Sequence, residues 1–396
     1  MTIATNAGRQ LRRAFNNCMK YTIDSRLVEP GDYFIPFKGP RFDGRDFIPD
    51  VIKNGGRVLD VDLGAFAKKY RKKLKCSVLA VTGSAGKTTT KDMLYAVLSQ
   101  KYKVVKTEEN QNNEVGVPLT ILRADFSTEI LILEMGMRGL GQISELARIA
   151  RPSHVVITNI GLAHIELLGN QKKIALAKSE VFLKRLDWER PKRFAFLNAS
   201  TAYYDTLVAR SNRVGFDVLP FGGNDKPEQN INCCFSVGRH FGLSDDEIHD
   251  GLKTYRPSSH RMTPLELPHN VTVLDDTYNA NPDGVIYSLQ YLRRYSGRKI
   301  LVLGDMLELG DWSESAHQSI VDVAIDAGVE LLFTTGEHTQ KITMASDLVW
   351  MAHFESKDTL VRQLIDEVKP GDVILVKGSR GMTMETVVNA LVEGIR

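Results

Sequence analysis

The fold of this chain is decided by the stretch Thr82-Gly83-Ser84-Ala85-Gly86-Lys87-Thr88-Thr89-Thr90. An apolar run over residues 78–81 precedes it and predicts a buried strand, and the pattern of residues 87–99 predicts a helix. In the order strand, glycine-containing loop and helix, the loop amides and the helix N-terminus are typical of a phosphate-binding site. A coincidental turn is the alternative, and the flanking strand and helix argue against it. We therefore predict that the chain binds a nucleoside triphosphate.

Two side chains of this loop have individual expected tasks. The Lys87 ammonium is expected to reach the outer phosphates, and the Thr88 hydroxyl is expected to ligate a magnesium ion. The predicted nucleotide-binding residues of the loop are Gly83, Ser84, Ala85, Gly86, Lys87, Thr88 and Thr89.

Length and composition limit the class of protein. At 396 residues the chain is expected to form two or three domains, and 43% apolar residues are enough for buried cores. The net charge of +3 points to no particular partner, and the six basic residues within 68–75 are most simply the solvated face of a helix. We expect small-molecule substrates, no nucleic-acid partner and a monomer.

The sequence offers no targeting or disulfide signal. Residues 1–8 contain no apolar signal core, and no segment approaches 18 consecutive apolar residues. The four cysteines, Cys18, Cys76, Cys233 and Cys234, lack the spacing of a zinc site or a disulfide framework. We expect a cytoplasmic enzyme with reduced thiols and no membrane contact.

Apolar strands alternate with helical patterns along most of the chain. Before residue 76, turn-rich sequence around one short strand at Tyr33–Phe37 predicts a small α/β module. From residue 77 the alternation predicts a mostly parallel sheet covered on both faces, and a second series from residue 271 predicts a separate Rossmann-like domain. The predicted domains are 1–76, 77–262 and 263–396. The predicted strands are 78–81, 130–133, 155–158, 194–197, 271–274, 299–303, 331–335 and 373–376, and the predicted helices are 87–99, 142–150, 171–186, 283–294, 315–327 and 383–393.

Three further residues are candidates for the site because of their position. Glu134 ends a predicted strand, where an acid can hold magnesium, and His164 lies in the loop after the next strand. For His164 a packed or surface role is an equal alternative. Lys178 falls on the apolar stripe of the helix predicted over 171–186, where burial would lower its pKa and leave a neutral amine able to react with carbon dioxide. A snorkelling lysine is the alternative.

Taken together, these motifs resemble those of the Mur ligase family, whose members are ATP-dependent ligases that build the peptidoglycan stem peptide. The resemblance covers nearly the whole chain. It rests on the phosphate loop, on residues 112–120, 134–136 and 159–166, and on the helix segment 177–182. In the last predicted domain it rests on residues 275–282, 303–310 with His317, and 377–382, and in the first module on residues 24–26, 29–32 and 39–47.

The resemblance implies a set of roles for individual residues. Carbamylated Lys178 and His164 would hold one magnesium ion, and Thr88 and Glu134 a second. Arg261 would contact phosphate beside Lys87. Further residues carried over for ATP are Asp276, Asn279 and Asn281, and those carried over for the other substrates are Ser25, Arg26, Asn112, Asn113, Ser379 and Arg380. ATP would phosphorylate a carboxylate, and an amine would attack the acyl phosphate to give an amide, ADP and phosphate.

Three functional hypotheses remain at this point. The first is the peptidoglycan ligase. The second is a relative that joins a different carboxylate and amine. It is favoured by the stretch between residues 56 and 76, which is shorter than the resemblance leads us to expect of a complete domain. The third is a nucleotide-dependent switch, which has no need of an inward-facing lysine or of nucleotide-contact motifs in a second domain.

Overall fold

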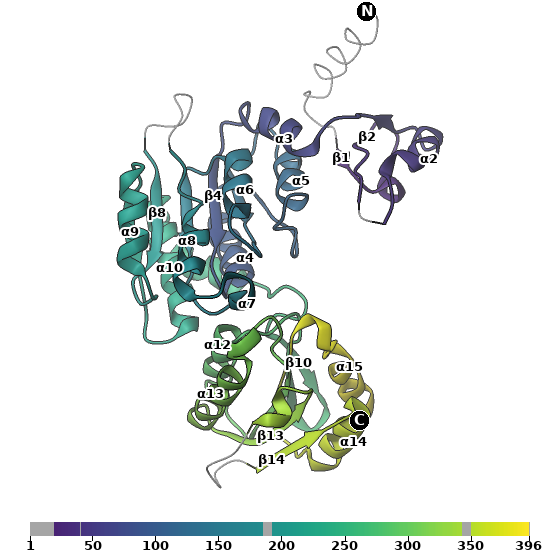
Figure 1. Cartoon of the computed structure of the whole chain (residues 1–396), viewed down its shortest axis with the longest axis vertical. Coiled ribbons are helices and arrows are strands. Elements are labelled where there is room, and N and C mark those ends of the chain that lie inside the picture. Colours follow the sequence, from purple (N-terminus) through teal and green to yellow (C-terminus); the bar gives the residue numbers. More distant parts are fainter. Residues whose placement is uncertain (1–19, 40, 185–191, 343–349, 396) are drawn as a thin grey trace, which may run out of the picture.

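The computed structural model describes residues 20–39, 41–184, 192–342 and 350–395, arranged around three β-sheets. Figure 1 shows a small N-terminal module beside the upper end of the middle domain and the last domain below that middle domain. Within the described residues, no helix is both long enough and apolar enough to cross a lipid bilayer. Cys18 lies outside the described residues, and Cys76, Cys233 and Cys234 are buried free thiols.

The N-terminal module is a small parallel sheet in the order β1-β2-β3. The strand predicted at Tyr33–Phe37 is shorter in the structure, where pairing stops at Phe34 and Pro36 lacks the N–H that a continued ladder needs. The elements are β1 (Tyr21–Thr22), η1 (Ser25–Leu27), β2 (Tyr33–Phe34), η2 (Gly44–Phe47), α2 (Ile48–Lys53), β3 (Arg57–Val58) and α3 (Leu63–Arg71).

Strands of two residues bury little, and the module shares its apolar core with the middle domain. The Tyr21 ring lies 5.6 Å from the Phe66 ring and 6.1 Å from the Tyr70 ring, centroid to centroid. Tyr70 and Arg71 in turn donate hydrogen bonds to backbone carbonyls of the middle domain, at 2.8 and 2.9 Å. Helix α3 therefore joins the small sheet to the middle domain.

The middle domain is a six-stranded, fully parallel sheet in the order β5-β6-β4-β7-β8-β9. Its strands are β4 (Ser77–Thr82), β5 (Val104–Lys106), β6 (Ile130–Glu134), β7 (His154–Ile157), β8 (Phe194–Asn198) and β9 (Asp217–Phe221). Its helices are α4 (Lys87–Leu98), α5 (Gly116–Arg123), α6 (Gln142–Ala150), α7 (Ile165–Leu168), α8 (Gln171–Ser179), α9 (Tyr204–Arg213), α10 (Lys226–His240) and α11 (Asp245–Thr254).

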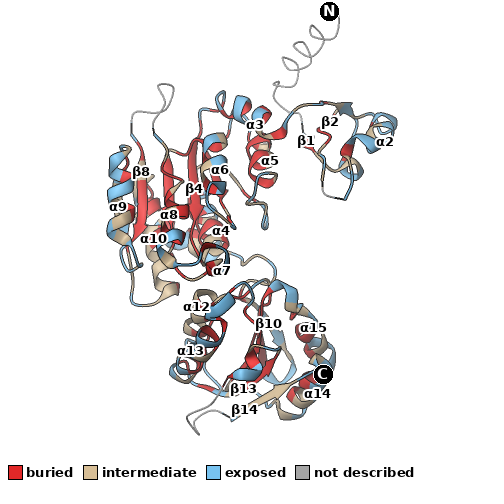
Figure 2. Ribbon diagram, viewed as in Figure 1, coloured by how far each residue is buried: buried red, intermediate tan, exposed pale blue. Residues whose placement is uncertain are grey.

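Apolar strands explain why this sheet is covered on both faces. In β4, Val78 and Ala80 pack with α5, α6, α8 and α9, whereas Leu79 and Val81 pack with α4, α10 and α11. Successive side chains of a strand point to opposite faces, so an uninterrupted apolar run must be buried from both sides. Figure 2 shows the resulting band of buried residues through the centre of this domain.

The last domain holds a six-stranded sheet in the order β10-β11-β15-β12-β13-β14. Only β10 runs antiparallel to its neighbour in this sheet of described strands. The strands are β10 (Thr263–Leu267), β11 (Val271–Asp276), β12 (Lys299–Gly304), β13 (Val329–Thr335), β14 (Trp350–Phe354) and β15 (Val373–Lys377). The helices are η3 (Pro268–Asn270), α12 (Pro282–Leu292), η4 (Gly310–Trp312), α13 (Ser313–Asp326), η5 (Thr339–Lys341), α14 (Lys357–Glu367), η6 (Arg380–Met382) and α15 (Glu385–Gly394).

The predicted strands and helices are present with shifted ends, with one larger difference. The helix predicted over 171–186 ends at Ser179, and residues 185–186 of that prediction lie outside the described residues. After Ser179 the backbone tightens into a turn with hydrogen bonds from Val181 N to Lys178 O and from Phe182 N to Ser179 O. The Glu180 carboxylate in this turn accepts hydrogen bonds from Gly141 N and Ser144 N at the start of α6. A carboxylate at a helix N-terminus satisfies otherwise unpaired amides, which stabilises this turn.

Candidate active site

A cavity of about 910 Å³ lies between the middle and last domains. It is lined by the loops that follow β4, β6 and β7 and by those that follow β11, β12 and β15, so the carboxyl ends of two sheets face each other across it. The predicted site residues that line it are Ser84, Ala85, Gly86, Lys87, Thr88, Thr89, Asn112, Asn113, Glu134, His164, Lys178, Arg261, Asp276, Asn279, Asn281, Ser379 and Arg380. Ligand clefts at the carboxyl ends of parallel strands are the rule for open α/β sheets.

The loop after β4 is shaped by two glycines. Gly83 has a φ of 153°, and a β-carbon there would lie 1.8 Å from the Thr158 hydroxyl oxygen. Gly86 has a φ of 75° and precedes the first turn of α4. Both conformations are open to glycine and strained for other residues, so the loop can bring its backbone amides to the cavity.

Asn159 holds this loop from the neighbouring strand. Its side-chain oxygen accepts hydrogen bonds from Ser84 N at 3.0 Å and Ala85 N at 2.9 Å, and Gly161 N donates to the Ser84 hydroxyl. Asn159 belongs to the motif recognised over residues 159–166, but nothing in the sequence identifies it as a partner of the loop 74 positions away. It supports the phosphate loop rather than lining the cavity.

Two lysines share one carbonyl oxygen at the base of the loop. Lys87 Nζ lies 2.9 Å and Lys178 Nζ 2.8 Å from Gly83 O. Lys178 is only 2% exposed, which confirms its predicted inward position and excludes snorkelling. Burial lowers its pKa well below the ordinary value, and the nearby charge of Lys87 lowers it further. Burial also lowers the pKa of Lys87.

Glu134 provides a buried anionic group beside the loop. Its carboxylate is 1% exposed, and Asn112 Nδ2 donates to Oε1 at 2.7 Å. Oε2 is buried and has no hydrogen-bond partner among the described residues. An unsatisfied buried carboxylate oxygen beside a phosphate loop fits a hard cation such as Mg²⁺. No three His, Cys, Asp or Glu side chains gather into a metal site in the described ranges.

Lys91 is the buried cation next to this carboxylate, and no pattern in the sequence singles it out. Its side chain is fully buried on α4, with Nζ 3.7 Å from Glu134 Oε2, 3.5 Å from Asp92 Oδ1 and 3.2 Å from Glu109 O. Asp92 also accepts from Lys106 and from the Ser258 hydroxyl, both at 2.5 Å. A buried ion pair requires both partners, because one charge left alone in the interior is costly.

Replacing Lys91 by methionine is therefore expected to destabilise the ligand-free protein by about 3 kcal/mol. Urea denaturation followed by circular dichroism measures the change, and Lys68→Met on the exposed face of α3 is the matched control. Adding Glu134→Gln to Lys91→Met removes the unpaired charge and should restore most of the loss. A single variant within about 0.5 kcal/mol of wild type would contradict this account of Lys91.

His164 lies at the meeting point of the two domains. It is the N-cap residue of α7 with a φ of 62°, and its Nδ1 is 2.9 Å from Oε2 of Glu308 in the last domain. Burial lowers the pKa of His164, and the charges of Lys87 and Lys178 lower it further, while Glu308 acts in the opposite direction. A neutral imidazole ring can bind a metal ion, so the geometry permits the ligand role of His164 as well as a packed role.

The wall of the cavity opposite the phosphate loop contributes cations and fixed loops. The Arg261 guanidinium stacks 3.8 Å from the centre of the Tyr278 ring. Asp276 does not project freely into the cavity, because its carboxylate pairs with buried Lys377 and accepts from the Ser288 hydroxyl. Burial lowers the pKa of Lys377. Lys377 lines the cavity, and although it belongs to the motif at residues 377–382 the sequence does not predict it as a site residue.

Several predicted residues of the site have clear roles in holding its loops. Asn281 caps α12 through its side-chain oxygen, and Asn113 Oδ1 accepts hydrogen bonds from Val115 N and Gly116 N at the start of α5. The Ser379 hydroxyl donates to Ala280 O and accepts from Leu307 N, which ties three loops together. Asn279 Oδ1 accepts from Arg380 N at 3.2 Å. The contacts of Asn279, Asn281 and Ser379 preorganise the last-domain wall of the cavity, and those of Asn113 hold the start of α5 in the middle domain.

Four residues of the recognised motifs lie outside the cavity. Ser25 and Arg26 belong to the small module and do not line the cavity, and Arg26 pairs with Asp24 at 2.6 Å. Asp32 accepts from Glu29 N and closes a turn. His317 is 1% exposed, and its Nε2 accepts from Met306 N, so it supports the loop after β12 from behind.

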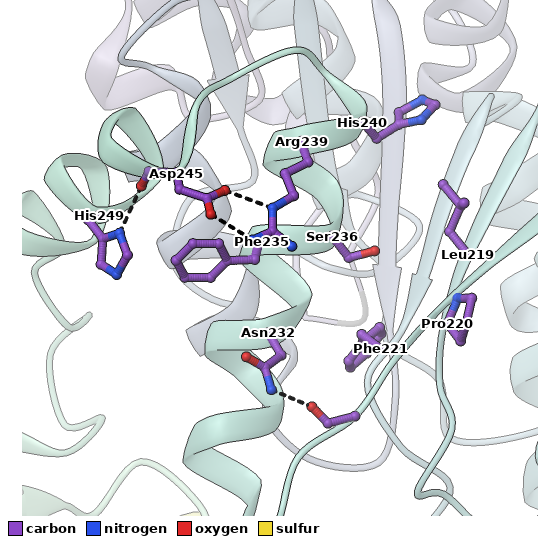
Figure 3. Close-up of a pocket in the computed structure, with 11 residues that line it drawn as sticks. Leu219, Pro220, Phe221, Asn232, Phe235, Ser236, Arg239, His240, Asp245 and His249 are labelled. Carbon is purple, nitrogen blue, oxygen red and sulfur yellow. Dashed lines mark hydrogen bonds and ion pairs between the residues drawn. The ribbon is translucent and has the colours of Figure 1, made fainter.

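A second cavity of about 800 Å³ lies at the outer edge of the middle domain, along β9, α10 and α11. Figure 3 shows that its charged and amide groups are paired with groups of the protein itself: Arg239 contacts Asp245, and Asn232 donates to the carbonyl of Gly222. None of the predicted site residues lines it.

Comparison with known proteins addresses the identity of the larger cavity. Models of the Mur ligase family match three parts of the chain: the Mur ligase family catalytic domain at residues 20–113, the Mur ligase middle domain at 81–250, and the Mur ligase glutamate ligase domain at 260–380. The UDP-N-acetylmuramoyl-tripeptide–D-alanyl-D-alanine ligase of Bacillus subtilis strain 168 is 33% identical, over 93% of this chain and 92% of that protein. The chain belongs to the Mur ligase family.

Further members of the Mur ligase family give the same picture. The ligase of the same name from Escherichia coli K12 is 32% identical, over 94% of this chain and 93% of its own length. Among solved structures, the MurF ligase of Thermotoga maritima in complex with ADP aligns with a TM-score of 0.80 and 28% identity, covering 95% of this chain and 98% of that one. The expected α/β architecture of a three-domain Mur ligase is confirmed.

Proposed function

We propose that this protein is an ATP-dependent ligase of peptidoglycan precursor synthesis that joins D-alanyl-D-alanine to UDP-N-acetylmuramoyl-tripeptide. The observation that carries the proposal is that a phosphate loop of the middle domain faces Arg261 and the last-domain loops across one cavity. Relatives that carry this activity in their names align over more than nine tenths of the chain. A nucleotide switch would have no use for a substrate-sized cleft built from two domains.

The cavity suits phosphoryl transfer to a carboxylate. Such a transfer needs alignment of the reacting oxygens and neutralisation of charge more than covalent help from the protein. Lys87 and Arg261 supply positive charge from opposite walls, and the amides of residues 86–88, at the start of α4, supply hydrogen-bond donors. The amine of the second substrate then attacks the acyl phosphate, and amide, ADP and phosphate are released.

We further propose two magnesium positions and a modified lysine. Thr88 and Glu134 would hold one ion, and His164 with a carbamate on Lys178 the other. Magnesium, when bound, neutralises phosphate charge. Glu134 Oε2, which lies 3.7 Å from Lys91 Nζ but accepts no hydrogen bond from the described residues, supports the first position. The second is supported by the lowered pKa of Lys178, since a neutral buried amine can react with carbon dioxide.

The small module is proposed to bind the nucleotide part of the acceptor. Arg26 is highly exposed and is held in a fixed orientation by Asp24, which leaves part of its guanidinium open to a diphosphate. Asp32 is expected to maintain the turn rather than contact the ligand, because Glu29 N already donates to its carboxylate.

Calorimetric titration with UDP-N-acetylmuramoyl-tripeptide tests this proposal. Arg26→Ala is expected to weaken binding about tenfold or more, since a charge-assisted contact contributes a few kcal/mol. Arg213→Ala, at the exposed end of α9, is the control. Absence of binding at millimolar concentration would contradict the cell-wall acceptor and favour a relative that joins another carboxylate.

The complete reaction is tested by product mass. Enzyme, ATP and Mg²⁺ are incubated with the UDP-linked tripeptide and D-alanyl-D-alanine, and the product is read by mass spectrometry beside ADP release. We expect amide formation that depends on all three substrates. Release of ADP without either partner would instead favour a nucleotide switch.

We also propose where and in what state the enzyme works. ATP and nucleotide-linked precursors are metabolites of the cytoplasm, and the described cysteines are free thiols, which suits that compartment. A monomer is proposed because both walls of the cavity come from this one chain.

A further inference from the structure

Glu308 is an exposed carboxylate that reaches across the domain boundary. It lies in the loop between β12 and η4, and its side chain is 48% exposed. Its Oε2 lies 2.9 Å from His164 Nδ1, although the two residues are 144 positions apart. Glu308 lines the cavity between the middle and last domains, although the proposed function assigns it no role.

The contact fixes the state of the histidine ring. A carboxylate can only accept a hydrogen bond, so Nδ1 must carry the proton in this pair. The other ring nitrogen, Nε2, then keeps its lone pair available. Histidines that bind metals usually donate their second ring N–H to a carboxylate or carbonyl, which orients the ring and raises its basicity.

Both backbones are strained at the point of contact. His164 has a φ of 62° and Glu308 a φ of 63°, in the left-handed region that residues with a β-carbon rarely adopt. Strain of this kind persists only where the surrounding structure imposes it, and it is concentrated at functional sites.

The loop that carries Glu308 is held on three sides. Met306 N donates to His317 Nε2 at 2.9 Å, and Leu307 N donates to the Ser379 hydroxyl at 2.8 Å. Gly310 lies against Glu166 of α7 so closely that an added β-carbon would be 3.1 Å from its side chain. The last domain thereby places Glu308 against α7, at whose N-terminus His164 lies.

We propose that Glu308 is a positioning residue that completes the metal-binding form of His164 from the opposite domain. The metal site is then finished only when the last domain is seated on the middle domain, so that chemistry is tied to closure around the nucleotide. This proposal rests on the function proposed above, and it adds a residue and a coupling to it.

Manganese and AMP-PCP, an ATP analogue without a bridging nitrogen, provide the test. Pulsed electron paramagnetic resonance detects the nitrogen coupling of a histidine bound to Mn²⁺, and ¹⁵N-histidine labelling with His164→Ala assigns the signal. Glu308→Ala is expected to weaken this Mn²⁺ site by 10- to 100-fold and to reduce the coupling, with nucleotide affinity changed less than about twofold. Glu308→Gln keeps an acceptor oxygen without charge and is expected to fall between.

Matched measurements separate this proposal from general damage and from the proposed function. Glu314→Ala, at an exposed position of α13, should behave as wild type, and melting curves should be alike because Glu308 is exposed. Wild-type coupling and Mn²⁺ affinity in Glu308→Ala would overturn the proposal even if the ligase assay succeeds. A failed ligase assay with the coupling present in wild type and lost in Glu308→Ala would instead refute the substrates and leave the role of Glu308 standing.

Discussion

Replacing Lys87 by alanine is expected to lower ATP turnover by at least about 10³-fold, equivalent to about 4 kcal/mol of transition-state stabilisation. The half-buried Lys87 ammonium rests on Gly83 O and Ser84 O, within reach of any phosphate chain held by the loop. Because these contacts are local to one turn, the variant should remain folded. Steady-state ADP release and thermal melting together measure the two effects.

The matched control for Lys87→Ala is Lys101→Ala, which removes an exposed lysine just beyond the end of the same helix. It should retain wild-type turnover. Near-normal ADP release by Lys87→Ala would refute the assignment of the loop as the nucleotide site. Loss of the cooperative melt would mean that the lysine is structural.

Lys178→Ala is expected to be nearly inactive and to recover part of its activity in the presence of acetate. The buried amine with its lowered pKa is expected to carry a carbamate in the active enzyme, and a short carboxylate can replace that negative group. Lys172→Ala on the exposed side of the same helix is the control. Rescue by acetate would show that the group lost from the variant is an anion.

Removal of carbon dioxide gives an independent check on Lys178. Wild-type enzyme in degassed buffer should lose activity and regain it when bicarbonate is added, whereas Lys178→Ala should not respond to bicarbonate. Full activity of the variant, or indifference of the wild type to carbon dioxide, would leave Lys178 as a structural lysine that donates to Gly83 O.

The central strands could be predicted from the sequence because their apolar runs leave no alternative to burial on both faces. The edge strands could not. β9 contains Pro220 and two exposed positions, and β5 is three half-buried residues long, so neither has a pattern that differs from a loop. The antiparallel β10 has a similar weakness, since alternate residues are exposed and it contains Pro264.

The site residues likewise fall into those that a local sequence pattern identifies and those that it does not. The phosphate loop, Glu134 and Lys178 could be found because local pattern fixes their position on a strand end or an apolar stripe. Lys91 and Glu308 could not, because their importance depends on partners 43 and 144 positions away, Glu134 and His164 respectively. For Asp276 the sequence predicts a nucleotide contact, because its motif resembles one. In the structure its carboxylate is already paired with Lys377.

The aromatic cluster that joins the small sheet to α3 decides where this protein can be recombined with a relative. A transplant cut between β3 and α3 would separate Tyr21 from Phe66 and Tyr70 and leave both fragments with an unfilled hole. A cut placed after Leu74 keeps the cluster whole. Across that seam Tyr70 and Arg71 donate to main-chain carbonyls, which a foreign host also supplies. The Tyr70 ring also lies 6.4 Å from the Phe126 ring, centroid to centroid, so the host should keep an aromatic residue at that position. Chimaeras with altered substrate range should therefore be spliced at that seam.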